Sequence, residues 1–274
     1  MERSATTLGF AEKALARFAS HLGEHEFSVT VIGGLNPSHL TRDTAAPHQG
    51  TTDVDVLVEV GFVYERDELD LSWLESSLRA AGFEPRDDET WRWWTDVDGV
   101  AVKLELLCDT PDSPSLQIVL PGCPTATAMN VRGPRPALHD TVVRAIPLDD
   151  GPSAAVARVR FAGLGGYLLA KAAAVIQRAL PKDYYDLAFV LLYNVDGGPA
   201  AAGRAARQAL PADALDDYAG AFLSALVRFA DDNRDGPVLF AEQRLVDGED
   251  TEVDVLRQDA VTAAEEARRA FSEG

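Results

Sequence analysis

The chain has 274 residues, of which 44 are acidic and 25 basic, so its formal net charge is −19. A charge of this size excludes broad electrostatic attraction to nucleic acid, and only a local basic patch could bind phosphate groups. No apolar run approaches the ~20 residues that span a bilayer, and we expect no secretory signal because the N-terminal residues lack an apolar segment. The two cysteines form no CxxC pair and are too few for a disulfide framework or a zinc cluster. With 46% hydrophobic residues we expect a cytoplasmic globular protein of one or two domains, whose acidity fits simple solubility, a cationic substrate or a basic partner protein.

The first predicted elements are a helix and two strands with a loop between them. Apolar residues recur at helical spacing over 8–22, and a β-branched run over 27–32 predicts a strand that ends at Gly33-Gly34. Residues 35–50 predict a polar loop, because they are rich in Pro, Asn, Ser, Thr and His. Polar and apolar residues then alternate over 52–60, which is the period of a strand.

The middle of the chain predicts one more helix and a pair of strands. The helix covers 71–81 and stops at Gly82. Two strands, over 90–95 and 100–107, are joined by a turn around Asp98-Gly99. Residues 111–150 are crowded with Pro, Gly and Asp, which indicates short strands mixed with loops.

From residue 165 the chain becomes helical in character. The pattern predicts helices over 165–180, 181–193, 213–231 and 251–271. We therefore expect an α+β fold with an α+β domain over 1–160 and a helical domain over 161–274. A ligand cleft between two such lobes would be typical.

Two carboxylates two residues apart are the most informative feature of the sequence. Asp53 and Asp55 point to the same face of a predicted strand. Adjacent carboxylates repel each other unless cations bind between them, and such oxygen ligands suit magnesium. A solvated strand without a metal is the alternative. Glu105 offers a third carboxylate on a later strand, although an ion pair with Lys103 on the same face is equally compatible with the pattern.

A glycine pair precedes the carboxylate strand. Gly33-Gly34 lets the backbone approach a triphosphate, with N–H groups and the hydroxyl of Ser38 as donors. The alternative is a plain tight turn. The order of strand, glycine pair, polar loop and DxD strand is more specific than either motif alone.

These motifs together resemble a known superfamily. Gly33-Gly34, Asp53-Val54-Asp55 and Glu105 are similar to the signature of the polymerase-β-like nucleotidyltransferases. The later segments 168–171 (LLAK) and 182–187 (KDYYDL), with Arg178 between them, resemble the helical motif of the AbiEii-type toxin family, whose members are nucleotidyltransferase-like toxins. The resemblance covers roughly residues 28–193, and the loop after the glycine pair is longer than is usual in the family and carries His39, Arg42 and His48.

The resemblance implies a polymerase-β-like mixed sheet with flanking helices, followed by a C-terminal helical lobe. It also implies an enzyme that moves a nucleoside monophosphate from an NTP to an acceptor hydroxyl and releases pyrophosphate. Asp53, Asp55 and Glu105 would hold two Mg²⁺ or Mn²⁺ ions, and Glu105 would accept the proton of the acceptor. The acceptor would be RNA such as a tRNA end, with a cognate antitoxin as protein partner. A small cationic acceptor such as an aminoglycoside, or a catalytically silent relative that binds a partner protein, is the alternative.

Lysine 171 is the expected phosphate contact outside the sheet. Lys171 lies in an alanine-rich helix, where its ammonium either reaches solvent or meets a buried anion. The resemblance favours a phosphate, which Lys171 would hold together with Gly33, Gly34 and Ser38. On that basis Lys171→Ala should weaken NTP use and leave the fold largely intact.

Several further side chains are candidates for supporting roles. Lys182 and Asp186 are spaced for a helix-surface ion pair, while Asp183 and Asp186 would otherwise orient Lys171 or bind the acceptor. Three tryptophans, Trp91, Trp93 and Trp94, indicate core packing or, alternatively, base stacking. We expect a nucleic-acid patch, if one exists, to be drawn from Arg42, Arg92, Lys103 and Arg178.

Overall fold

The computed structural model describes residues 5–42, 44, 46–48, 51–148, 155–212 and 215–273. The chain divides into two compact units. We call residues 1–35 and 50–162 the sheet unit, and residues 36–49 and 163–274 the helical unit. The second boundary thus falls after Ala162, beside the position expected from the change in composition, and a short early segment joins the helical unit.

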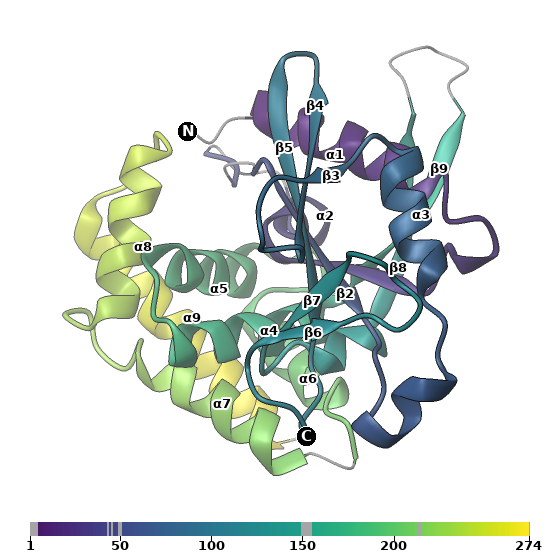
Figure 1. Ribbon diagram of the computed structural model, residues 1–274. Coiled ribbons are helices and arrows are strands. Elements are labelled where there is room, and N and C mark those ends of the chain that lie inside the picture. The colour runs from purple at the N-terminus through teal and green to yellow at the C-terminus, as the bar shows by residue number, and fades with distance from the viewer. Residues whose placement is uncertain are drawn as a thin grey trace. The chain divides into compact units, whose positions relative to one another are not determined.

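The sheet unit contains a mixed β-sheet, so the fold class is α+β (Figure 1). In the described residues nine strands take part, in the order β3-β4-β5-β2-β1-β9-β8, with β7 beside β5 and β6 beside β7. β2 runs parallel to β5, as β1 does to β9, and the remaining pairs except β5–β7 are antiparallel. The strands are β1 (Val29–Ile32), β2 (Asp53–Val58), β3 (Glu84–Pro85), β4 (Arg92–Val97), β5 (Val100–Cys108), β6 (Gln117–Val119), β7 (Thr127–Asn130), β8 (Thr141–Pro147) and β9 (Val156–Ala162).

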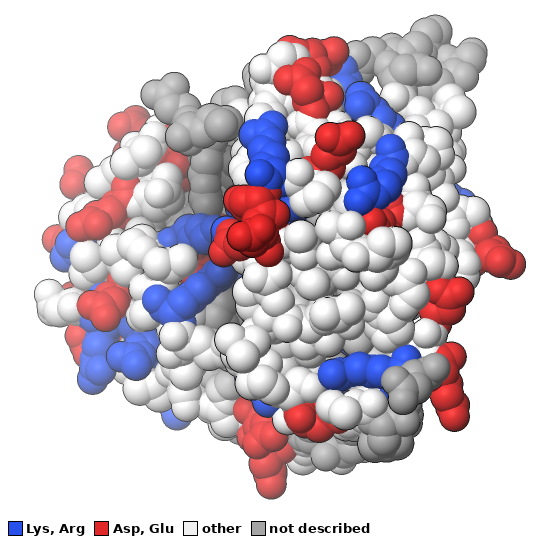
Figure 2. Space-filling model, in the orientation of Figure 1, with Lys and Arg blue, Asp and Glu red and all other residues white. Residues whose placement is uncertain are grey.

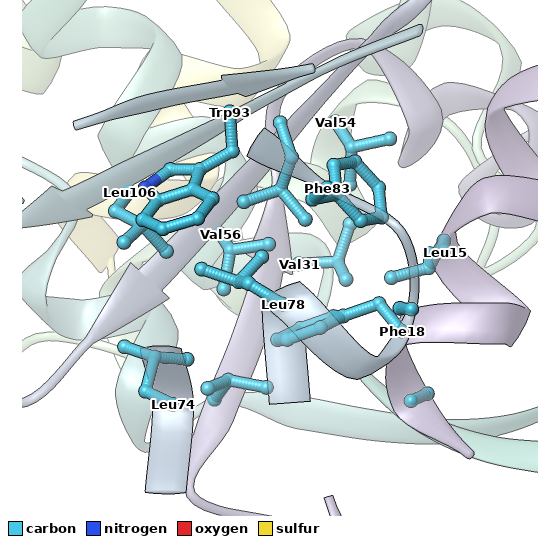
Figure 3. Close-up of a cluster of buried hydrophobic side chains, with 14 of the residues drawn as sticks. Leu15, Phe18, Val31, Val54, Val56, Leu74, Leu78, Phe83, Trp93 and Leu106 are labelled. Atoms are coloured by element: carbon cyan, nitrogen blue, oxygen red, sulfur yellow. The ribbon is translucent and has the colours of Figure 1, made fainter. Parts of the chain in front are cut away.

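Alternation over the first half of β2 and along most of β5 gives these neighbouring strands one apolar and one polar face. Val54 and Val56 on β2 and Leu104 and Leu106 on β5 are fully buried. Helices α1 (Ala5–Ala19) and α3 (Ser72–Ala80) contribute to the same apolar core through residues such as Phe18 (Figure 3). The 3-10 turns of this unit are η1 (Gly23–His25), η2 (Gly33–Leu35), η3 (Val63–Glu68) and η4 (Arg135–Leu138).

The turn between β4 and β5 follows the prediction. Asp98 and Gly99 both have positive φ, at 53° and 82°. Two consecutive positive φ values define the type I′ turn whose twist suits a two-residue hairpin, and Asp-Gly is a preferred pair for it. The same hairpin places β4 in antiparallel register with β5.

The helical unit has more helices than the sequence predicted. Its helices are α2 (Pro37–Leu40), α4 (Leu164–Gln177), α5 (Pro181–Tyr193), α6 (Pro199–Gln208), α7 (Leu215–Val227), α8 (Asp235–Val246) and α9 (Val253–Glu273). The pattern missed α6 because small residues, rather than a large apolar stripe, make its contacts. A Cβ added at Gly203 would overlap the carbonyl oxygen of Ala267 in α9, and one at Gly165 of α4 would overlap that of Ala205 in α6. α8 was missed because Gly236-Pro237 reads as a break, although proline is well tolerated in a first turn.

The segment between the glycine pair and β2 is not simply the polar loop that the sequence predicted. It contains α2, which begins at Pro37 after Asn36, and it belongs to the helical unit. Thr41 forms a β-bridge with Asn194, and the Arg42 N–H donates to the Tyr193 carbonyl over 3.0 Å. Residues 43, 45, 49 and 50 of the predicted loop lie outside the described residues.

In the part of the chain that the structure describes, no helix combines the length and the apolar character needed to cross a membrane.

Candidate active site on the polar face of the sheet

The three predicted carboxylates share one face of the sheet unit. In the parallel pairing of β2 with β5, Asp53 lies opposite Lys103 and Asp55 lies opposite Glu105. All four side chains are partly exposed, whereas the alternating residues between them are buried in the core. The period-two argument for Asp53 and Asp55 therefore describes the strand correctly, and the register adds Glu105 to the same patch.

The glycine pair is fitted around the carboxylate strand. Gly33 has φ of +78°, and a Cβ added there would overlap the Asp55 carboxylate and lie 2.7 Å from its Cγ. At Gly34 an added Cβ would lie 2.9 Å from Cγ2 of Thr51, just before β2. Glycine is therefore favoured at position 33 by both the left-handed backbone and the close approach, whereas at position 34 the only opposition to a larger residue is the Thr51 side chain.

A lysine of the protein itself lies among the carboxylates. The Lys103 Nζ is 2.9 Å from Oε1 of Glu105 and 3.4 Å from Oδ2 of Asp53. Arg92 on β4 donates from Nε to Glu105 over 2.9 Å and also pairs with Glu89. The ion pair considered as an alternative for Glu105 is thus formed, and the repulsion expected between bare carboxylates is offset by two cations.

Burial and these partners set the protonation behaviour of the patch. Burial raises the pKa of the Glu105 carboxyl, but the hydrogen bond and charge of Lys103 and the hydrogen bond from Arg92 hold that pKa below its ordinary value. Burial lowers the pKa of the Lys103 ammonium, but Glu105 and Asp53 more than offset this and raise it. Glu105 is therefore ionised near neutral pH, as a metal ligand or proton acceptor must be.

The oxygen atoms of Asp53, Asp55 and Glu105 suit a hard cation, although the Lys103 ammonium now lies between Asp53 and Glu105. Carboxylate oxygens are the ligands that Mg²⁺ takes in proteins. Among the described residues no group of three or more His, Cys, Asp or Glu side chains is arranged to hold a metal ion. Lys103 supplies the neutralising charge beside Asp53 and Glu105, so a cation bound there would compete with its ammonium.

A second charged cluster is buried in the helical unit. The Lys171 Nζ of α4 lies 2.7 Å from Oδ2 of Asp186 and 3.4 Å from Oδ1 of Asp183, both on α5. Arg178 donates to both Asp183 oxygens over 2.8 Å. The His48 Nε2 completes the cluster at 2.8 Å from Oδ1 of Asp186. Of these side chains only that of Arg178 is substantially exposed, at 51%.

The pairing decides between the alternatives for this region. Lys171 meets buried anions rather than solvent, because its side chain is 8% exposed and is held by two acids. Asp186 pairs with Lys171 and His48 rather than with Lys182, which is exposed on the first turn of α5. Asp183 and Asp186 therefore orient Lys171, which is one of the roles considered for them.

Burial and charge act in opposite directions on this pair as well. Burial raises the pKa of Asp186, but the charge of Lys171 and the hydrogen bond with His48 hold that pKa far below its ordinary value. Burial lowers the pKa of Lys171, and Asp186 and Asp183 raise it overall. Lys171 is thus a cation at neutral pH, and its charge is already shared between two carboxylates.

The predicted phosphate-binding residues and the predicted basic patch each include residues of both units. Ser38 lies on α2 of the helical unit, while Gly33 and Gly34 belong to the sheet unit, so no single unit contains the predicted phosphate cradle. Figure 2 shows acidic and basic side chains interleaved on the viewed face. Of the residues named for a basic patch, Arg92 and Lys103 are ion-paired in the sheet unit, and Arg42 and Arg178 belong to the helical unit.

The comparisons with known proteins identify no relative. No family model, curated protein or solved structure matches this chain. The assignment of a function therefore depends on the residues and their geometry.

Proposed function

We propose that this protein is a metal-dependent nucleotidyltransferase. The observation that carries the proposal is the fit of Gly33 against the Asp55 carboxylate, within a face where Asp53, Asp55 and Glu105 are in register on neighbouring strands. A glycine turn packed directly against a paired-carboxylate strand brings backbone donors for a phosphate next to oxygen ligands for a cation.

Each carboxylate has a role that its surroundings support. Asp53 and Asp55 would hold Mg²⁺ or Mn²⁺, and two such ions would stabilise the charge on the attacking and leaving oxygens of an in-line displacement. Glu105, ionised near neutral pH, accepts the proton of the acceptor hydroxyl. With cations held by Asp53 and Glu105, the Lys103 ammonium beside them would be available to the anionic ligand as a flexible point charge.

The metal and phosphate chemistry of this proposal is confined to the sheet unit. Lys171 of the helical unit is buried, and its charge is already shared between Asp183 and Asp186. RNA is the acceptor that the toxin-like motif favours, with a cognate antitoxin as a protein partner. The acidic surface is compatible with this acceptor only if binding is confined to a small region.

The proposal is tested by label transfer. The protein is incubated with each α-labelled NTP, Mg²⁺ or Mn²⁺ and total RNA, and the product is separated into RNA, protein and small-molecule fractions. We expect label in RNA with one preferred NTP, and loss of at least 100-fold in rate for Asp53→Asn and Glu105→Gln, as is typical when a charge-stabilising group is removed. Glu24→Gln, at a side chain that is 91% exposed, is the control.

Two results would contradict the proposal. One is an absence of transfer from any NTP to any fraction. The other is transfer that survives in Asp53→Asn at the rate of the control variant.

A further inference from the structure

Two of the three clustered tryptophans differ sharply in their surroundings. Trp93 is fully buried in the core of the sheet unit, and its indole Nε1 donates to the Thr90 carbonyl over 2.9 Å. Core packing, the first interpretation of the tryptophans, is therefore correct for Trp93. Trp94, the next residue along β4, points to the opposite face because side chains alternate along a strand.

The register places Trp94 on the carboxylate face. Trp94 lies opposite Lys103 in the β4–β5 pairing, and Lys103 lies opposite Asp53 in the β5–β2 pairing. Trp94, Lys103 and Asp53 are therefore side by side on the three neighbouring strands β4, β5 and β2. With neighbouring strands ~4.8 Å apart, the Trp94 and Asp53 backbones are roughly 10 Å from each other.

An arginine covers the ring of Trp94. The Arg86 guanidinium carbon is 4.6 Å from the ring centroid, and Arg86 is exposed while Trp94 is half-buried. A stacked arginine at an exposed site is only weakly held, so another planar group can compete with it or stack beside it. Indole and guanidinium planes together are the surfaces on which proteins stack unpaired bases.

The order of the strands indicates whether the triphosphate or the acceptor would lie beside Trp94. The glycine turn follows β1, the paired acids are on β2, Glu105 is on β5 and Trp94 is on β4. The glycine turn and Trp94 therefore flank the carboxylates from opposite sides. A triphosphate at the glycine turn leaves the Glu105 side, and hence Trp94, for the acceptor.

We infer that Trp94, together with Arg86, is a stacking subsite for a nucleobase of the acceptor, an inference that rests on the proposed function. Arg86 brings a cation to the ring, whereas Arg92 and Lys103 are paired with acids of the same face and Glu84 lies opposite Trp94. The subsite therefore offers a flat stacking surface rather than a positive patch, and an unpaired base at the end of a single-stranded nucleic acid is the ligand group that such a surface suits.

Binding of a short single-stranded RNA to the full chain, without NTP or metal, tests the subsite. Anisotropy of a labelled RNA is compared with that of an abasic strand of the same length, which has the same phosphates and no bases. Trp94→Leu should weaken binding of the RNA about tenfold, because stacking of one base is worth roughly that factor, and should leave abasic binding unchanged. Trp94→Tyr, which retains an aromatic face, should restore most of the affinity, and Arg86→Ala should have a smaller effect than Trp94→Leu.

The outcomes separate this inference from the proposed function. Trp94-dependent RNA binding without label transfer would retain the subsite and reject the enzyme. Label transfer to RNA with an unchanged KM for RNA in Trp94→Leu would retain the enzyme and reject the subsite. Equal binding of both strands, no RNA binding at all, or binding of an aminoglycoside that depends on Glu84 rather than on Trp94 would also overturn the inference. Thermal unfolding of each variant confirms that the fold is retained.

Discussion

Glycine 33 is held in its conformation by two separate requirements, and a substitution can measure each of them. In Gly33→Ala the added Cβ meets both a left-handed backbone and the Asp55 carboxylate. Gly99→Ala is the matched control, because Gly99 has φ of +82° and open space around its Cα. We expect Gly99→Ala to cost about 1–2 kcal/mol, which is the price of the left-handed backbone. Gly33→Ala should cost about 1–3 kcal/mol more, from the clash.

Urea unfolding measures both variants, and Asp55→Ala completes the comparison. In the double variant Gly33→Ala/Asp55→Ala the clash is relieved, so the two effects should not add. Additive effects would show that the contact between the glycine turn and Asp55 is energetically unimportant.

The carboxylates of the polar face should differ in their contribution to stability. Asp53 is 37% exposed in its side chain and makes one long ion pair, so Asp53→Asn should change the free energy of unfolding by less than about 1 kcal/mol. Glu105 is 14% exposed and accepts hydrogen bonds from two cations, so Glu105→Gln should cost about 1.5–3 kcal/mol. Denaturant titration at neutral pH checks the order, and a greater loss for Asp53→Asn would contradict it.

Alternation along the strands was enough to predict which side chains share the polar face. It placed Asp53 with Asp55 and Lys103 with Glu105, because a strand has only two faces. It did not predict that Lys103 would also meet Asp53, since that contact depends on the parallel register of β2 with β5, which no local pattern specifies. Alternation also puts Trp93 and Trp94 on opposite faces, but it does not specify that Trp94 lies beside Lys103, since that depends on the antiparallel register of β4 with β5.

Between elements, the pairing of α4 with α5 reverses the expectation for Lys171. Removing one partner from a buried ion pair leaves the other charge uncompensated, so Lys171→Met should cost about 3–5 kcal/mol rather than leave the fold intact. Lys182→Met, at an exposed position on α5, is the control and should change stability by less than about 0.5 kcal/mol. Thermal and urea unfolding compare the two, and equal stability of both variants would mean that the buried pair is not formed.

The same pair predicts a dependence of stability on pH. The folded pKa of Asp186 is depressed, so its contribution is present above the unfolded pKa of about 3.9 and is lost as the pH falls below that value. The folded pKa of Lys171 is raised, so its contribution is present below about pH 10.4 and is lost as the pH rises further. Unfolding free energies of the wild type and Asp186→Asn, measured from pH 3 to pH 7, should therefore converge towards the acid end. A constant difference between the two unfolding free energies from pH 3 to pH 7 would contradict the depressed pKa of Asp186.

The sequence pointed to His48 only as a residue of the long loop and did not indicate its partner, and the reason is distance along the chain. Its partner Asp186 is 138 residues away, and Arg244 of α8, which donates to the Ala46 carbonyl, is more distant still. Helical periodicity reports which face of a helix is buried but not which distant segment covers it. The segment 36–49 was consequently read as a loop, although its backbone and side chains are built into the helical unit.

For the whole molecule, this discontinuity predicts how the units behave when they are separated. A fragment of residues 163–274 lacks the partners of Asp186, Asn194 and Arg244 that segment 36–49 provides. We expect the fragment alone to be destabilised and to gain helical circular dichroism and thermal stability when a peptide of residues 36–49 is added. A peptide with His48→Ala should stabilise it less, while one with Arg42→Ala should act as the original, because Arg42 pairs through its backbone. A fragment equally stable with and without the peptide would contradict this.

During synthesis, segment 36–49 is made well before the residues that hold it in the folded protein. The ribosome completes this segment early, but the α5 and α8 residues that hold it are made only after residues 50–162. His48 and Asp186 are 138 residues apart, so at about 5–20 residues per second the delay until this partner is made lasts roughly 7–28 s. During this interval α2 and His48 have no helical unit to join, and β1 can pair with β9 only once residue 162 has been made. The nascent chain therefore carries this segment without its folded-state partners throughout the synthesis of the sheet, and we expect proteases to cut it more readily at that stage than in the folded protein.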